Sequence, residues 1–493
     1  IFSLKACKLD FSFVYLFVFF GLMKLVCILQ SSHRKFKDRK QKLQNIRKKL
    51  AELRLKLLQV KLGRLKARVQ RVHVDGISRT KDDIVIGSVR DVFTAADFQT
   101  VILRIHEARM RLENLGCFKN VGVLIDTYSG DGAYDDGIEV TFEVKEVNLL
   151  GAKINTNVGN NEGSITSGGM LRNIFGRGEE LSTEYSYGTK RTSSFHTTFR
   201  KPFHNEAATE LSTSIYQQAS EAPWSGYKEL DRGVLLSLAF ATAPSIEQKL
   251  ILDGAWRHLS CLSRSTAFAV REQSGHSLKS ALRHELSLDK RDELVFPTDG
   301  IAFNMKNEFA GLGGDVGFFK NELNFQLNLP LVNEMVVQGS VQAGHMLPLR
   351  NNKTHCIIDR FILGGPTSVR GFEMGGVGPH SDNHALGAEM YWAAGLHFYC
   401  PLPLLGRGGS FSDKFRLHSF VNIGNIGDFD LTDNYKRNLE NLFKDMRLSY
   451  GAGLAMSLGG FARVELNYCI PLILQRYDRP YNGIQFGVST NFL

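Results

Sequence analysis

The sequence predicts an all-β transmembrane barrel of about 16 antiparallel strands, preceded by one small α/β domain. Three observations predict it: repeated period-2 alternation from residue 150 to the end, aromatic residues near strand ends, and a composition of 47 Gly and 34 Phe but only 12 Pro. Segments of about ten alternating residues are the sequence sign of a membrane barrel. The charged fraction of 22% and the mean hydropathy of −0.14 exclude a disordered chain and a helical membrane protein.

Residues 1–68 form the first region of the chain, in which an apolar segment is followed by a basic one. Residues 11–29 are almost wholly apolar and approach the length of a spanning helix. They fit a signal sequence, a membrane anchor, or an artefact of upstream sequence at residues 1–22 with Met23 as the start. The sequence leaves these three explanations open.

Residues 33–68 carry 15 Lys and Arg against two acidic residues, which accounts for the net charge of +10. Apolar residues recur at spacings of three and four across residues 41–62, which predicts a basic amphipathic helix. Such a helix fits contact with a membrane or a partner, a mitochondrial targeting segment, or a solvated linker. Residues 69–493 are net negative, so we do not expect nucleic acid as a partner.

Residues 69–148 predict the α/β domain, with the element order β-α-α-β-β. Thr94 is the predicted N-cap of the longer helix and Gly116 its C-cap. The exposed strand edges of such a domain suit the addition of an extended segment from another chain, and a passive spacer is the alternative. Periodicity places the elements at residues 69–75, 81–90, 94–115, 121–125 and 138–144.

Residues 149–493 predict the barrel, because apolar and polar residues alternate there again and again. In residues 461–470, for example, Val464, Leu466 and Tyr468 alternate with Arg463, Glu465 and Asn467. A soluble sandwich alternates too. The strand number and a final strand that reaches the last residue favour a barrel, which leaves no backbone edge in lipid. Segments begin near residues 150, 164, 179, 193, 207, 231, 246, 276, 299, 316, 334, 385, 414, 447, 461 and 484, and residues 265–272 are an ambiguous extra.

No pattern in the chain predicts an enzyme, a cofactor or a metal site. The seven cysteines are scattered without a CxxC pair, which favours isolated reduced thiols. Neither a phosphate-binding GxxxxGK[ST] loop nor an HExxH metal motif occurs. His380 and His384 are four residues apart, but they lie in a Ser/Asp/Asn-rich stretch, where loop polarity is the better explanation.

One motif connects the predicted barrel to a known family. Residues 361–372 read Phe-Ile-Leu-Gly-Gly-Pro-Thr-Ser-Val-Arg-Gly-Phe, and Val369, Arg370, Gly371 and Phe372 form its core. This element resembles the sixth-loop signature of the outer-membrane protein assembly-factor family. The mitochondrial branch, the core barrel subunits of the sorting and assembly machinery, is similar over residues 69–493. Residues 158–164, 274–280, 386–397 and 467–471 carry that further similarity.

The resemblance implies a function and a location. A member of this family would fold and insert β-barrel precursors into the mitochondrial outer membrane, through a lateral gate between its first and last strands. Residues 69–148 would be a POTRA domain in the intermembrane space. The implied partners are β-barrel precursor proteins, metaxin-type accessory subunits, the inner-membrane contact-site complex and membrane lipids.

The resemblance also implies roles for particular residues. In this family the loop arginine, here Arg370, pairs with an Asp in a Phe-x-Asp-x-Gly strand motif. This sequence has Asn422 at the Asp position, which removes the charge, and Glu389 falls on the polar side of its strand. Asn422 and Glu389 are therefore the candidate partners of Arg370. We expect Arg370 to project into the barrel lumen and to hold its loop there.

The lateral gate would join the first and last predicted strands, from Leu150 to Val158 and from Ile484 to Phe492. In the family, a last strand of this kind carries a polar-x-Gly-x-x-apolar-x-apolar signal. Gln485, Gly487 and Phe492 fit that signal. Thr490 departs from it, because it replaces an apolar residue.

Two other functions compete with precursor assembly. A passive outer-membrane channel or a protein-translocating pore would use the same fold. A soluble nucleic-acid-binding protein would use the basic residues 33–68. Alkaline carbonate extraction separates the second alternative, since a barrel stays with the membrane pellet.

Overall fold

The computed structural model describes residues 66–159, 162–203, 208–331, 334–349, 356–402, 414–428, 440, 443–460, 462–489 and 492–493. The apolar segment expected at residues 11–29 and the basic helix expected at residues 41–62 lie outside these ranges. Contacts divide the chain into two units. The first contains most of an α/β module, and the second contains the barrel together with Ile77–Val85 and Glu113–Asn120.

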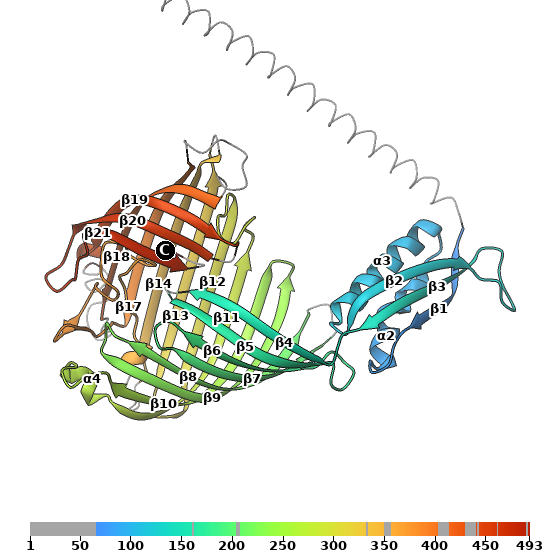
Figure 1. The fold of residues 1–493 in the computed structure, drawn as a ribbon, viewed down its shortest axis with the longest axis horizontal. Helices are drawn as coiled ribbons and strands as arrows, with labels where there is room; N and C mark the ends of the chain where they lie inside the picture. Colours follow the sequence, from blue (N-terminus) through green and yellow to red (C-terminus); the bar gives the residue numbers. More distant parts are fainter. Residues whose placement is uncertain are drawn as a thin grey trace, which may run out of the picture. The chain divides into compact units, whose positions relative to one another are not determined.

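The α/β module has the predicted element order (Figure 1). Its three-stranded sheet has the order β1-β3-β2, and β1 runs parallel to β3. Helix α3 buries Val101, Ile105, Ala108 and Leu112, the apolar positions that recur at helical spacing. The elements are β1 (Arg68–Asp75), α2 (Asp82–Val89), a 3-10 helix η1 (Arg90–Thr94), α3 (Phe98–Asn114), β2 (Phe118–Thr127) and β3 (Gly137–Glu146).

The predicted N-cap of α3 is wrong by three residues, because Asp97 and not Thr94 precedes the helix. Thr94 ends the 3-10 helix, and its hydroxyl donates a hydrogen bond to the carbonyl of Asp91. The longer helix begins only at Phe98, and the Asp97 N–H donates to the Thr100 hydroxyl. Gly116 has a φ of +70° just beyond the helix, the left-handed conformation that glycine adopts at helix ends.

The second unit is a 16-stranded antiparallel sheet in which each strand pairs with its neighbours along the chain, so the predicted fold class is confirmed (Figure 1). All 16 predicted segments correspond to strands. The strands are β4 (Leu150–Gly159), β5 (Glu162–Arg172), β6 (Glu180–Gly188), β7 (Ser193–Pro202), β8 (Glu210–Ala222), β9 (Tyr227–Ala243), β10 (Ile246–Cys261), β11 (Gly275–Asp289), β12 (Gly300–Gly314), β13 (Phe318–Pro330), β14 (Val336–Pro348), β17 (Met390–Pro401), β18 (Phe415–Gly427), β19 (Arg447–Leu458), β20 (Ala462–Ile473) and β21 (Gly483–Ser489).

Two predicted boundaries differ from the structure. The ambiguous segment at 265–272 is not a strand but contains the short helix α4 (Phe268–Glu272). The strand expected from residue 385 begins at Met390, because β15 (His380–Ser381) and β16 (His384–Ala385) form a small hairpin of their own.

The two faces of the barrel strands have opposite chemistry. On β20, Leu466 and Tyr468 are exposed on the outer face, whereas Glu465 and Asn467 are buried. An apolar outer face and a polar inner face are typical of membrane barrels and are the reverse of a soluble sandwich. Among the described helices, none has both the length and the apolar character needed to cross a membrane.

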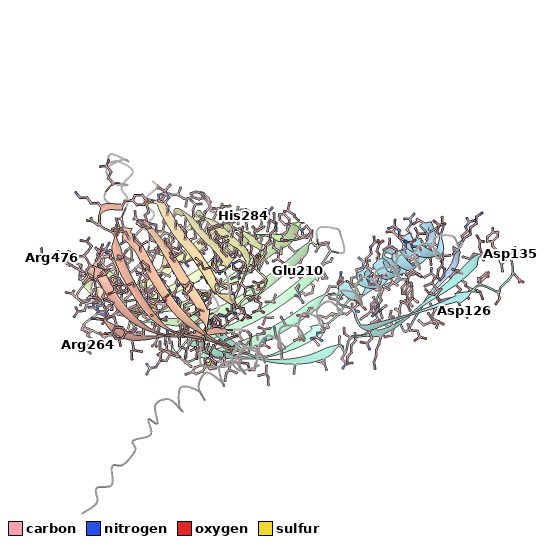
Figure 2. All side chains as sticks on the ribbon, turned by 90° about the horizontal axis from the view of Figure 1, so that it is seen from above. Asp126, Asp135, Glu210, Arg264, His284 and Arg476 are labelled. Carbon is pink, nitrogen blue, oxygen red and sulfur yellow. The ribbon has the colours of Figure 1, made fainter. Side chains whose placement is uncertain are left out.

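The antiparallel order places alternate connections at opposite ends of the strands. Figure 2 shows Glu210, the first residue of β8, at one end, and Arg264 and Arg476, in the connections after β10 and β20, at the other. The long connection between β14 and β17, residues 349–389, emerges at the same end as Arg264 and Arg476. This connection contains the motif at residues 361–372.

Candidate functional site

The connection between β14 and β17 packs against the inner wall of the barrel. Its apolar residues join buried side chains from six strands and the last residue of the chain in one hydrophobic cluster. The connection and the barrel wall therefore share a core inside the barrel. The cluster contains Phe361, Leu363, Val369, Phe372, Val377 and Ala388 of the connection, and Ala281, Ala310, Phe318, Met346, Ala393, Ile426 and Leu493 of the surrounding chain.

Arg370 is completely buried and forms an ion pair with Glu465 on β20. Its Nη2 lies 2.8 Å and its Nε 3.1 Å from Oε2 of Glu465, and its Nη1 donates to Oδ1 of Asn422 at 3.5 Å. The guanidinium carbon lies 5.0 Å from the ring centre of Phe420 and 5.3 Å from that of Phe492. A buried guanidinium needs such acceptors, since removing a charge from water without a partner is costly.

The acceptor Glu465 replaces Glu389 among the candidate partners. Glu389 lies just before β17, and six residues further along that strand Gly395 pairs with Asn422. At about 3.4 Å per residue, Glu389 is displaced by about 20 Å along the strand from the level of Asn422. A signal for Glu465 was present in the sequence, because this carboxylate falls on the polar side of its alternating segment.

Neighbouring side chains hold the Glu465 carboxylate in place. Arg463 Nε lies 3.0 Å from Oε1, and Asn467 Nδ2 donates to Oε2 at 2.9 Å. His418 Nδ1 lies 2.9 Å from Oδ1 of Asn467. The cluster therefore fixes one carboxylate between two guanidinium groups, which suits the positioning of the Arg370 loop.

The motif also binds the last strand through its backbone. Gln485 on β21 accepts a hydrogen bond from the Gly371 N–H at 2.9 Å and donates one to the Phe372 carbonyl at 2.7 Å. The N–H of Leu493 donates to the carbonyl of Thr367 at 3.1 Å. Gly371 has a φ of +83°, which strains any residue with a Cβ. The loop thus contacts both the middle of β21 and the end of the chain.

The predicted gate strands β4 and β21 are the two ends of the sheet. Their Cα atoms come within 8 Å of each other, yet no backbone ladder joins them in the part of the chain that the structure describes. Leu150, the first residue of β4, and Ile484, the second residue of β21, have exposed side chains, and Val158 pairs with Gly163 on β5.

Phe492 does not continue β21, contrary to the prediction. The strand ends at Ser489, so the period-2 rule no longer sets the direction of later side chains. Phe492 is buried, and its ring lies under the guanidinium groups of Arg370 and Arg463. It is part of the inner cluster and not of the outer surface.

Gln485 and Gly487, two residues of the predicted last-strand signal, both lie on the inner face of β21. A Cβ on Gly487 would come within 3.3 Å of Cβ of Pro366 and 3.2 Å of the Phe492 ring. The loop therefore approaches β21 closely where this strand has no side chain. Thr490 lies outside the described residues.

The two loop histidines make local contacts. His380 Nδ1 lies 2.8 Å from the Gly378 carbonyl, and His384 Nδ1 lies 2.9 Å from the Asp382 carbonyl. Within the described ranges, no group of three or more His, Cys, Asp or Glu side chains is arranged to hold a metal ion.

Comparisons with known proteins assign this architecture to a family. The Omp85 superfamily domain matches residues 173–492. The chain is 45% identical over 426 residues to "Sorting and assembly machinery component 50 homolog" of Bos taurus. It is 44% identical, also over 426 residues, to the Homo sapiens protein of the same name. Each match covers 86% of this chain and 90% of the relative. A SAM50-like protein of Drosophila melanogaster is 36% identical over 433 residues, covering 87% of this chain and 95% of that protein.

Among solved structures, BamA from Haemophilus ducreyi lacking POTRA domains 1–3 matches with a TM-score of 0.71 at 19% identity. The match covers 86% of this chain and 84% of that one, and at this identity it shows the fold alone. With the family domain over the barrel and close relatives along most of the chain, this protein belongs to the Omp85 superfamily, in the branch of the sorting and assembly machinery component 50 homologues.

Proposed function

We propose that this protein folds β-barrel precursors and inserts them into the mitochondrial outer membrane through a lateral gate between β4 and β21. The observation that carries the proposal is the seam: the two end strands of the sheet approach within 8 Å, without a backbone ladder among the described residues. Its membership in the branch of sorting and assembly machinery components supports a role in barrel assembly.

The chemistry of the seam suits this task without an active site. A precursor strand entering lipid must satisfy its backbone N–H and C=O groups, each of which costs several kcal/mol if left unpaired. The edges of β4 and β21 offer such groups, and an incoming strand can pair with them by strand addition. Neither a nucleotide nor a metal is required for that exchange.

The α/β module and the partners belong to the same proposal. Residues 69–148 act as a POTRA domain in the intermembrane space, where the edges of their sheet contact precursors. The β-α-α-β-β order and a fold match that covers 86% of the chain support this assignment. Metaxin-type accessory subunits, the inner-membrane contact-site complex and membrane lipids complete the set of proposed partners.

The alternative of a passive channel or protein-translocating pore is less compatible with the packing. Six apolar residues of the β14–β17 connection share a core with the inner wall, which fills space that an open channel needs. The deciding experiment replaces the endogenous homologue with this chain in cells and follows the assembly of an imported, radiolabelled porin precursor. Restored assembly is expected; lost assembly with a normal amount of folded barrel and high pore conductance would favour the channel.

A further inference from the structure

The β14–β17 connection is held by a second buried ion cluster, eleven residues before Arg370. We infer that Asp359 is a positioning residue that fixes the start of this connection to the barrel wall opposite Arg370. The connection then spans the lumen as a strap with an ion pair at each end. The inference concerns the strap itself and rests on the proposed function only for its consequence in precursor assembly.

Asp359 makes a bidentate ion pair with Arg257 on β10. Arg257 Nη1 donates to Oδ1 at 2.9 Å and Nη2 to Oδ2 at 3.0 Å, and the two side chains are only 3% and 4% exposed. Lys279 on β11 adds a contact of 3.2 Å to Oδ1. Lys320 on β13 donates to the backbone carbonyl of Asp359 at 3.0 Å. Three strands therefore hold one residue of the connection.

The position of these strands makes Asp359 a separate anchor. Counted from β4, β10 and β11 are the seventh and eighth strands of the sheet, whereas β20, which carries Glu465, is the fifteenth. The two anchors thus lie about half of the 16-strand circuit apart. Eleven residues reach at most about 36–40 Å, so the segment between Asp359 and Arg370 has the length to cross a lumen.

The wall around Asp359 is already charged in an alternating pattern. In the strand register, Arg283 on β11 lies opposite Glu308 on β12, and Glu308 lies opposite Lys320 on β13. Lys279 lies 2.7 Å from Glu308 as well as 3.2 Å from Asp359. Without Asp359, Arg257 would lose its bidentate carboxylate partner in a buried place, which is costly for a charge. The wall is thus built to receive a carboxylate from the connection.

Apolar contacts strengthen the same end of the strap. Ile357 is buried in a cluster with Ala267 and Val270 at α4 and with Tyr227 at the start of β9. Phe361 packs under Lys320, whose Nζ lies 4.3 Å from its ring centre. The start of the connection is therefore fixed to strands that do not form the seam. Its tip, residues 366–372, contacts β21 through the hydrogen bond from Gly371 to Gln485. Loss of the first anchor is expected to loosen the tip.

The test uses the full chain refolded into lipid vesicles, with cysteines introduced as Pro366→Cys and Gly487→Cys. The Cβ atoms of these positions would lie 3.3 Å apart, close enough for a disulfide that reports a docked tip. A second readout is the conductance of the same protein in a planar bilayer. A Pro366→Cys protein without the second substitution controls for reaction with native Cys469, which lies near Gly371.

Asp359→Asn is expected to slow disulfide formation at least threefold and to raise conductance, whereas Asp359→Glu retains most of the parental behaviour. The matched control is Asp382→Asn, the same change at an exposed position in the same connection, which should alter neither readout. Arg257→Lys keeps the charge but loses the planar fork, and it should give an intermediate effect even if Asp359→Asn does not fold.

Parental rates and conductance in a folded Asp359→Asn protein would overturn the inference, as would a parental Arg257→Lys protein if Asp359→Asn cannot be refolded. Neither readout requires a precursor. If Asp359→Asn alters both readouts but the unsubstituted chain does not assemble porin, the proposed function is contradicted and the second anchor is supported. If the unsubstituted chain assembles porin but Asp359→Asn leaves both readouts unchanged, the proposed function is supported and the second anchor is contradicted.

Discussion

Arg370 and Glu465, 95 residues apart in the sequence, form an ion pair in which the two side chains are 0% and 1% exposed. The arginine comes from the connection between β14 and β17, and the glutamate comes from the strand next to the last one. The pair therefore ties the loop motif to the wall beside the proposed gate. Breaking such a buried pair by removing one partner typically costs about 3–5 kcal/mol, because the other charge is left uncompensated.

The first prediction concerns this pair. Arg370→Ala and Glu465→Gln should each slow the release of an imported porin precursor more than tenfold while the barrel stays folded, and Arg370→Lys should rescue only in part. Assembly is followed by native electrophoresis, and Glu389→Gln is the control, expected to behave as the parent. A Glu389→Gln defect equal to that of Arg370→Ala would contradict the assignment of Glu465.

The second prediction concerns the seam. Cysteines placed on the inner faces of β4 and β21 should cross-link on oxidation, since the two strands are neighbours and no backbone ladder joins their described residues. The cross-link should stop porin insertion, and reduction should restore it. The control is a cysteine pair across β12 and β13, a closed ladder of the same barrel, whose cross-link should leave insertion unchanged. Full insertion through a locked seam would remove the lateral gate.

The third prediction is that residues 69–148 fold by themselves. Helix α3 covers the three-stranded sheet with a complete apolar face, which is enough for one modest core. Expressed alone, the segment should unfold cooperatively in circular dichroism and give a dispersed NMR spectrum. Amides in Ile77–Val85 and Glu113–Asn120, whose contacts assign them to the barrel unit, should exchange fastest. A disordered NMR spectrum would show that the domain boundary at residues 69–148 is wrong.

The fourth prediction concerns Glu146 at the end of β3. Burial alone would raise the pKa of its carboxyl, but hydrogen bonds from the N–H groups of Thr80 and Arg79 and from the hydroxyls of Thr80 and Ser78 outweigh burial and hold that pKa below its usual value. A carboxyl with a lowered folded-state pKa stabilises the structure above its unfolded pKa, and this stabilisation is lost as the pH falls toward the folded-state value.

Protection of the amides at residues 78–80 against hydrogen exchange, corrected for the intrinsic rate, should therefore decrease as the pH falls below about 4.5. Glu146→Gln should lower this protection at neutral pH and remove most of its pH dependence. The control is Glu143→Gln on the same strand, where the side chain is exposed. Equal protection in both variants at neutral pH would show that the carboxylate does not hold this turn.

The sequence by itself determined the elements that depend on local periodicity. Alternation located all 16 barrel strands, because side chains of a strand face opposite sides with a period of two whatever the strand contacts. The family resemblance pointed to Arg370 and Asn422, and alternation placed Glu465 on the polar side of its segment; all three side chains are buried. Periodicity did not identify α4, because a helix of five residues is too short to show a repeating pattern.

Only the tertiary structure decided which of the inward-facing residues meet. Glu465 and not Glu389 pairs with Arg370, because strand register and the path of the β14–β17 connection set the level along the barrel at which the guanidinium arrives. Phe492 turns inward because β21 ends before it, which parity does not reveal. Asp359 finds Arg257 102 residues away for the same reason. Periodicity fixes the face of a strand, whereas contacts across a closed sheet depend on register and on where each connection enters the lumen.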